Sequence, residues 1–208
     1  MVRIPFKILL AFTALVFLTG IACAQDSSSG QDFSDYQSPG KTFRCILPKG
    51  WNVHEVPDHR RELTKVDGVN AYRGNFEGRV TLSVYYFPED NKLHKNMERY
   101  IEVHSRPVLG MKLEGHDYGP VSDMALKGAT GKTFQRSVIE YEDHVFNQKL
   151  GKYLEPLYPK QVSLTEIFIV MPAGSGFAAF RYKATPQTSK ANEHIFRQVV
   201  DSFIFLIY

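Results

Sequence analysis

The chain has 208 residues, and its 25 Lys and Arg against 22 Asp and Glu give a formal net charge of +3. A charge this close to balance lacks the strong basic field typical of nucleic-acid-binding proteins, so we predict no nucleic-acid partner. The length fits one domain with a core large enough to fold unaided.

Residues 1–24 have the layout of a secretory signal peptide. Arg3 and Lys7 supply the positive start, and the apolar core that follows runs from Ile8 to Leu18. This core is shorter than the ~20 apolar residues of a membrane-spanning helix. We therefore expect an exported protein, periplasmic or extracellular, whose signal segment takes no part in the fold.

Two processing outcomes are open at the end of this segment. Residues 22–24, Ala-Cys-Ala, form a small-x-small cleavage site, which favours removal of the signal peptide. Residues 20–23, Gly-Ile-Ala-Cys, also resemble a bacterial lipobox, although Gly20 stands where that motif usually has Leu. Lipidation of Cys23 would hold the protein on a membrane surface, whereas cleavage would release it. After cleavage Cys45 is the only cysteine, which excludes an intramolecular disulfide.

Residues 25–40 are rich in Ser, Asp and Gly, so we expect a flexible leader there. A single folded domain is then expected over residues 41–208. Its first strand is predicted over 42–47, where Phe43, Cys45 and Leu47 share one face. That position predicts a buried Cys45 thiol with a raised pKa and little reactivity.

The next part of the domain reads mainly as strands. A short strand, a polar loop, a weaker strand and a regularly alternating strand are predicted in that order, over residues 51–56, 57–61, 63–76 and 80–87. A helix is expected after the polar cluster 88–91, because apolar side chains recur there at helical spacing. Those side chains are Leu93, Met97, Tyr100, Ile101 and His104.

The segment after this helix is turn-rich, with short strands predicted around Tyr118 and Met124. A long strand over 130–141 changes the parity of its apolar side chains between Val138 and Ile139. This change predicts a β-bulge within the strand.

The clearest hairpin spans residues 162–184, where two apolar runs surround the sequence Gly-Ser-Gly at 174–176. Its first arm is apolar on both faces, so it needs cover on both sides of a sheet. A last helix with Ser189 as its N-cap carries an apolar seam, and a short extended segment ends the chain. The order of elements indicates an α+β fold: an α/β/α sandwich with a mostly antiparallel central sheet flanked by helices.

Two stretches resemble the PsbP-like family, relatives of the extrinsic photosystem II subunit and of a Ran-binding nuclear import factor. Residues 36–51, YQSPGKTFRCILPKGW, resemble the opening strand and Pro-x-Gly-Trp turn of the family, and residues 196–203, FRQVVDSF, resemble its last helix and closing strand. The resemblance implies an α/β/α sandwich, in agreement with the order of elements. It also implies an exported or lipoprotein envelope protein, because bacterial members are commonly of that kind.

Groups with catalytic or metal-binding chemistry are scattered along the chain. The seven histidines occur singly, without the His-x-x-x-His spacing or the cysteine pair of a metal site, so we predict no metal and no cofactor. The sequence therefore favours a non-enzymatic, exported cell-envelope accessory or binding protein. The alternative is an exported hydrolase or small-ligand-binding enzyme that assembles its site from separated residues such as Asp143, His144 and Ser175.

The long connection over 143–161 is the stretch that best fits a protein-specific role, because loops longer than ~12–15 residues are uncommon unless functional or disordered. Aromatic side chains are enriched in interface cores. The candidate partner-binding residues are Tyr153, Leu154, Leu157 and Tyr158. The other interpretation is a flap that folds back over the sheet. The expected partner is an envelope protein, with membrane contact only if Cys23 is lipidated.

Overall fold

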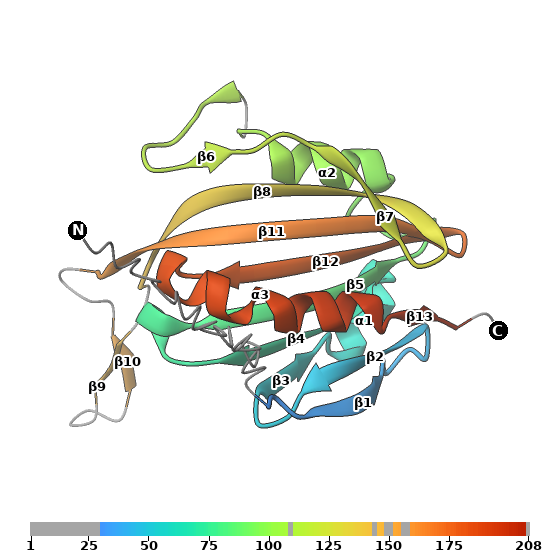
Figure 1. Ribbon diagram of the computed structural model, residues 1–208, viewed down its shortest axis with the longest axis horizontal. Coiled ribbons are helices and arrows are strands. Elements are labelled where there is room, and N and C mark those ends of the chain that lie inside the picture. Colours follow the sequence, from blue (N-terminus) through green and yellow to red (C-terminus); the bar gives the residue numbers. More distant parts are fainter. Residues whose placement is uncertain (1–29, 108–109, 143–144, 148–151, 155–158, 207–208) are drawn as a thin grey trace, which may run out of the picture. The chain divides into compact units, whose positions relative to one another are not determined.

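A computed structural model describes residues 30–107, 110–142, 145–147, 152–154 and 159–206 (Figure 1). The chain divides into two units, Met1–Gly30 and Gln31–Tyr208, and the fold described below is that of the second unit. None of its described helices is long and apolar enough to cross a membrane.

The centre of this unit is an eight-stranded sheet in which every pair of neighbours is antiparallel. Its order is β3 (Asn52–Glu55), β4 (Asp67–Arg73), β5 (Val80–Phe87), β12 (Gly176–Ala184), β11 (Gln161–Ala173), β8 (Ala129–Tyr141) and β6 (Asp117–Tyr118), with β7 (Ser122–Leu126) also paired to β8. The predicted hairpin is therefore confirmed as β11 and β12, and it lies in the middle of the sheet.

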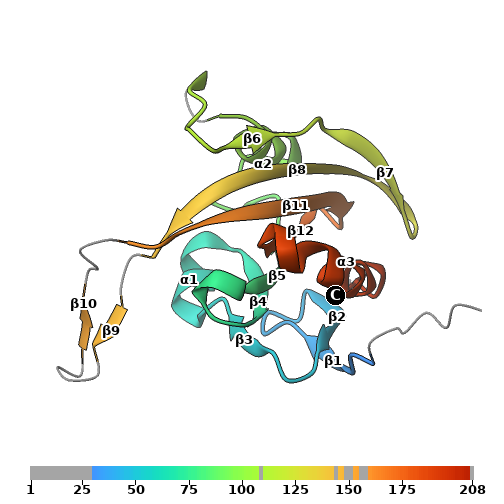
Figure 2. The same ribbon diagram turned by 60° about the vertical axis from the view of Figure 1, so that its left-hand side comes forward.

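Helices cover both faces of the sheet, as Figures 1 and 2 show. Helix α3 (Pro186–Asp201) packs on one face through Ile195, Phe196, Val199 and Val200. Helix α2 (Met97–Ser105) packs on part of the other face through Tyr100. We call these the α3 face and the α2 face.

A second, three-stranded antiparallel sheet adds to the apolar core on the α3 face. Its strands are β1 (Phe33–Gln37), β2 (Phe43–Pro48) and β13 (Ile204–Phe205), with β2 in the middle. Phe43, Cys45 and Leu47 of β2 are buried in that core, as their alternation predicted. The predicted fold class, an α+β sandwich with a mostly antiparallel sheet and flanking helices, is confirmed.

The prediction of a flexible leader is wrong for residues 33–37, because β1 lies inside it and pairs with β2. The folded unit accordingly begins at Gln31 and not near Lys41. The physical reason lies in the two bulky side chains of this stretch, Phe33 and Tyr36, which pack against the core.

Three further predictions differ from the structure. The loop over 57–61 is largely a helix, α1 (Asp58–Thr64), which buries no residue and therefore shows no apolar periodicity. The bulge in β8 does not form, since its register with β11 is unbroken from Lys132 to Tyr141. The N-cap of α3 is Thr185 and not Ser189, because Pro186 occupies the first position of the helix, where its missing N–H costs nothing.

The remaining elements lie in connections between strands of the central sheet. They are the short helical turn η1 (Phe76–Gly78) and the small antiparallel hairpin of β9 (Val145–Asn147) and β10 (Lys152–Leu154). The hairpin lies within the long connection that the sequence indicated as the most distinctive segment.

Candidate functional site

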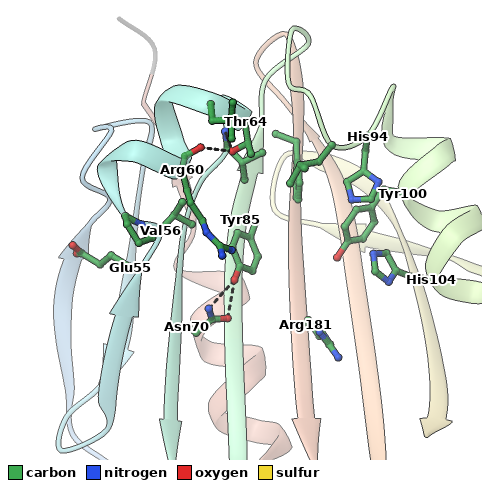
Figure 3. A pocket seen from close by; sticks show the side chains of 15 residues that line it. Glu55, Val56, Arg60, Thr64, Asn70, Tyr85, His94, Tyr100, His104 and Arg181 are labelled. Atoms are coloured by element: carbon green, nitrogen blue, oxygen red, sulfur yellow. Dashed lines mark hydrogen bonds between the residues drawn. The ribbon is translucent and has the colours of Figure 1, made fainter.

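A cavity of about 610 Å³ opens on the α2 face, beside the part of the sheet that α2 covers. Its lining comes from the β3–α1 segment on one side, strands β4, β5 and β12 below, and α2 with the loop before it on the other side (Figure 3). Its volume lies in the range of small-molecule pockets, roughly 300–1,000 Å³. We call it the α2-face cavity.

The wall on the α2 side is built from His94, Tyr100 and His104. The side chain of Asn91 accepts a hydrogen bond from the backbone N–H of His94 at 2.8 Å, which fixes the loop before the helix. Tyr100 and His104 lie about one turn apart on α2, so both reach the same face of the helix. The ring centroids are 4.9 Å apart for His94 and Tyr100 and 4.4 Å apart for Tyr100 and His104.

Burial lowers the pKa of both histidines in this wall. Desolvation, with help from the nearby guanidinium groups of Arg136 and Arg181, lowers the pKa of His104 to about 4. Burial, and secondly the charge of Arg99, also lowers the pKa of His94. His104 is therefore neutral at pH 7. Neutral imidazole packs against the aromatic rings beneath it without the cost of burying a charge.

On the floor of the cavity lie Asn70 of β4 and Tyr85 of β5, which form a hydrogen-bonded trio with Ser83 of β5. Asn70 donates to the Tyr85 hydroxyl at 2.7 Å and accepts from it at 3.0 Å, and the Ser83 hydroxyl donates to Asn70 at 2.6 Å. Gly68, opposite Tyr85 in the register, makes room for the Tyr85 ring, since a Cβ there would overlap it. The trio is thus rigid, and its groups largely satisfy one another.

A buried ion triad lies beside the cavity. Glu166 of β11 has no exposed surface and accepts a hydrogen bond at 2.5 Å from Nε of Arg136 on β8 and another from Nη2 of Arg181 on β12. Burial alone would raise the pKa of this carboxyl, but the two guanidinium groups outweigh it and hold the pKa below its usual range. Both guanidinium groups also lie over the ring of Phe168.

Arg181 connects this triad to the α2-face cavity. It lines that cavity, and it also lines a second cavity of about 470 Å³ towards β6 and β8. The structure therefore places one guanidinium between two cavities, with a buried carboxylate beside it.

The candidate residues from the sequence fall elsewhere. Cys23, Leu157, Tyr158, Asp143 and His144 lie outside the described residues. Tyr153 and Leu154 belong to β10, where the backbone pairs them with Phe146 and Val145.

Ser175 and Cys45, which the sequence analysis also considered for catalysis, both lie in the described part of the chain. Ser175 is exposed in the turn between β11 and β12 and lines a separate cavity of about 330 Å³. Cys45 is buried and burial raises the pKa of its thiol to about 12, as the sequence predicted for a thiol on the buried face of its strand. Within the described ranges no group of His, Cys, Asp and Glu side chains is arranged to hold a metal ion.

Sequence reasoning identified Tyr100 and His104 only as the apolar face of a helix, and it missed the triad. One signal was present in the first arm of the hairpin. Glu166 is the single charged residue in the apolar run from Leu164 to Met171, and a charge at such a position needs a buried partner. The sequence does not reveal that both partners come from neighbouring strands.

Neither a protein-family model nor a curated protein sequence matches the chain. The chain is similar to solved structures. One is the cyanobacterial PsbP (CyanoP) from Synechocystis: the match covers 85% of this chain and 94% of the CyanoP chain, with a TM-score of 0.48 and 12% sequence identity. The Ran-binding protein Mog1p of Saccharomyces cerevisiae is similar over 84% of this chain and 96% of that chain, with a TM-score of 0.44 and 10% identity. These are the two kinds of protein that the resemblance of residues 36–51 and 196–203 named.

Proposed function

We propose that this chain is a non-enzymatic binding protein, exported to the cell envelope, and that its ligand occupies the α2-face cavity. The observation that carries the proposal is the combination of a ligand-sized cavity with a rigid, hydrogen-bonded floor and an aromatic wall. Preorganised pockets of this kind, mainly apolar with a few fixed polar groups, are the usual form of small-molecule sites.

Binding is favoured over catalysis by the state of the ionisable groups around the cavity. The carboxylate of Glu166 is held by two guanidinium groups, so it is a poor general base. His104, with a pKa of about 4, is a weak base at neutral pH. The Cys45 thiol is buried in the core on the α3 face, away from this cavity.

The hydrolase alternative depends on Ser175, which does not line the α2-face cavity. Ser175 lines the separate 330 Å³ cavity at the β11–β12 turn, together with residues from the segment before α2. Its two supposed partners, Asp143 and His144, lie outside the described residues. Among the described residues no His, Asp or Glu side chain is hydrogen-bonded to Ser175, so the binding function remains our proposal.

Native mass spectrometry of the protein recovered from its own envelope under mild conditions tests this proposal. Leu63 is 74% exposed and lines the cavity, so Leu63→Trp should fill the entrance without disturbing the core. The neighbouring Glu62 is exposed and does not line the cavity, which makes Glu62→Trp the matched control. We expect an added mass on the wild type and on Glu62→Trp that is lost in Leu63→Trp. Equal added mass on all three, or none on any, would contradict the proposal.

Export is the second component of the proposal, and it rests on the predicted signal segment over residues 1–24. Intact mass of the protein from the native envelope distinguishes the two processing outcomes. A chain that begins at Gln25 indicates cleavage, and a diacylglyceryl group on Cys23 indicates a membrane-tethered protein. An unprocessed chain that begins at Met1 would overturn the export proposal.

An envelope partner is the third component, and we place it at the long connection that contains the β9–β10 hairpin. Crosslinking in the native envelope with the variant Tyr153→Ser/Tyr158→Ser tests this placement. Loss of a reproducible crosslinked partner at unchanged thermal stability is the expected result. A destabilised fold with an unchanged partner would instead indicate the flap interpretation.

A further inference from the structure

We propose that the ligand of the α2-face cavity is a small aromatic acid, whose anionic group is received by Arg181 and Arg60 and whose ring packs beside His94 and Tyr100. This inference rests on the proposed binding function and adds the chemical class of the ligand.

The charge balance around Arg181 is positive. In the triad two guanidinium groups share one carboxylate, which leaves one positive charge in excess beside the cavity. A separate ion pair on β12 and β8, Lys183 with Glu140 at 2.6 Å, is balanced within itself. A partly buried excess charge is unfavourable unless a counter-charge approaches it. An anionic ligand in the cavity would supply that counter-charge.

Two side chains that line the cavity, Arg181 and Tyr100, offer hydrogen-bond donors to a ligand. Arg181 uses Nη2 for Glu166, and the other nitrogens of its guanidinium make no hydrogen bond to a described residue. The hydroxyl of Tyr100 likewise has no partner among the described side chains, and Figure 3 shows it directed towards Arg181. A guanidinium beside a hydroxyl donor suits a carboxylate or phosphate oxygen.

A second cation stands on the opposite wall. The guanidinium of Arg60 in α1 makes no ion pair with any described residue, and in Figure 3 it extends towards Tyr85. The one carboxylate that lines the cavity, Glu55, already accepts a hydrogen bond from the hydroxyl of Tyr36 at 3.1 Å. The two arginines thus face the cavity from opposite sides, and a charged acid group between them would be attracted by both.

The wall indicates an aromatic body for the ligand. The rings of Phe87, His94, Tyr100 and His104 form a continuous array with neighbouring centroids 4.4–5.4 Å apart. Rings added to such an array adopt tilted or stacked contacts that stabilise more than their buried area alone. Val56, Val66, Leu63 and Leu93 complete an apolar lining around the ring position.

Titration calorimetry on the purified protein tests the class with three matched probes: naphthalene-2-carboxylate, naphthalene-2-carboxamide and octanoate. We expect the carboxylate to bind about tenfold or more tightly than the carboxamide, because only the former carries the charge. Octanoate, which has the charge without the ring, should also bind more weakly. Naphthalen-2-yl phosphate distinguishes a phosphate from a carboxylate as the preferred acid group.

Two variants locate the acid group without disturbing the triad. Arg60 is exposed, and Arg60→Gln should weaken carboxylate binding about three- to tenfold. The matched control is Arg79→Gln, because Arg79 is also exposed but does not line the cavity, and this variant should leave carboxylate binding unchanged. Tyr100→Phe removes only the hydroxyl and should weaken binding about threefold to tenfold. Leu63→Trp should abolish binding of every probe.

The outcomes separate the ligand class from the binding function. If the carboxylate and the carboxamide bound with equal affinity and Leu63→Trp abolished both, the proposal that the ligand is an acid would be overturned. The cavity would still be a binding site. If octanoate bound most tightly of the probes, the proposal that the ligand carries an aromatic ring would be overturned. No binding of any aromatic acid at millimolar concentration would overturn the whole inference, while the native mass experiment would still decide the proposed function independently.

Discussion

The two faces of the central sheet carry different chemistry although the same strands build both. On the α3 face β4, β5 and β12 present Val69, Leu82, Val84, Phe180 and Tyr182, all at most 1% exposed. On the α2 face the alternate positions of the same strands carry mostly polar side chains: Asn70, Ser83, Tyr85 and Arg181. Successive side chains of a strand point to opposite faces, so one sheet can support two different surfaces.

The two faces contribute unequally to the stability of the fold. The α3 face buries a continuous apolar layer under α3, and apolar burial is the dominant favourable term in folding. The α2 face is apolar only under α2, and beyond it lies a triad whose ions must be removed from water. Such an arrangement contributes little net stability compared with apolar residues of the same size. Its presence therefore fits a role in binding better than a role in folding.

The largest effect is expected on the α3 face. Phe180 is fully buried and packs edge-on against Phe203 with ring centroids 5.1 Å apart. Phe180→Ala should lower the free energy of unfolding by about 3–5 kcal/mol through lost burial and the cavity left behind. Urea denaturation followed by circular dichroism measures it. A loss below about 1 kcal/mol would show that this face is not the main source of stability.

The second effect tests the triad itself. Glu166→Gln leaves two guanidinium groups without their counter-charge, and breaking a buried pair in this way costs about 3 kcal/mol or more. Replacing the whole triad by Arg136→Met, Glu166→Leu and Arg181→Met together should restore wild-type stability or exceed it, while carboxylate binding in the cavity is lost. A triple variant as unstable as Glu166→Gln would mean that the triad does stabilise the fold.

The α3 face is also the part of the fold that the sequence predicts best. Its strands and helix have regular periodicity, so Phe43, Cys45 and Leu47 were assigned correctly to one buried face. Short elements without periodicity were missed: α1 buries no side chain, and β1 was hidden in a polar stretch. Periodicity reports burial, and an element with little burial leaves little trace in the sequence.

The candidate site was not predictable to the same extent, because it depends on register. Arg136, Glu166 and Arg181 are distant in sequence, and only the order β12–β11–β8 and its pairing bring them together. The sequence placed His104 on the apolar face of a helix, and the side chain is indeed partly buried there. That placement does not reveal which residues of the sheet it meets. The sequence gives the kind of residue, whereas the strand order decides which residues meet.

A third, smaller effect concerns pH on the α2 face. The pKa of His104 falls from 6.5 to about 4 on folding, so between these values the unfolded chain binds a proton that the native state does not. Stability should therefore fall as pH decreases from 6.5 towards 4, by about 2 kcal/mol between pH 7 and pH 5 from this group. The pKa of His104 is also lowered by the charges of Arg136, Arg181 and His94, and it is raised by that of Glu166.

Urea denaturation at pH 7 and pH 5 compares wild type with His104→Gln, and the variant should lose clearly less stability on acidification. His59→Gln, at an exposed position of α1, is the matched control and should keep the wild-type pH dependence. An unchanged pH dependence in His104→Gln would show that the imidazole is not desolvated in the folded protein, and the aromatic wall would need a different description.

The smallest effect compares two buried tyrosines, Tyr182 on the α3 face and Tyr100 on the α2 face, whose hydroxyls differ in their hydrogen-bond partners. On the α3 face the hydroxyl of Tyr182 donates to the backbone carbonyl of Ser189 at 2.8 Å. On the α2 face the hydroxyl of Tyr100 has no hydrogen-bond partner among the described residues, although the ring is only 5% exposed. Tyr182→Phe should cost about 1 kcal/mol, since it removes a buried hydrogen bond to α3, whereas Tyr100→Phe should stay within about 0.5 kcal/mol of wild type.

Stability and binding should therefore respond to these two substitutions in opposite ways. Tyr100→Phe removes a group that contributes nothing to the fold, so any loss of carboxylate affinity in that variant comes from the cavity and not from a damaged protein. Tyr182→Phe weakens the fold but should leave the affinity unchanged. Denaturation and calorimetry on both variants measure all four values. If Tyr100→Phe lost as much stability as Tyr182→Phe, its hydroxyl would be part of the core and the division between the two faces would not hold.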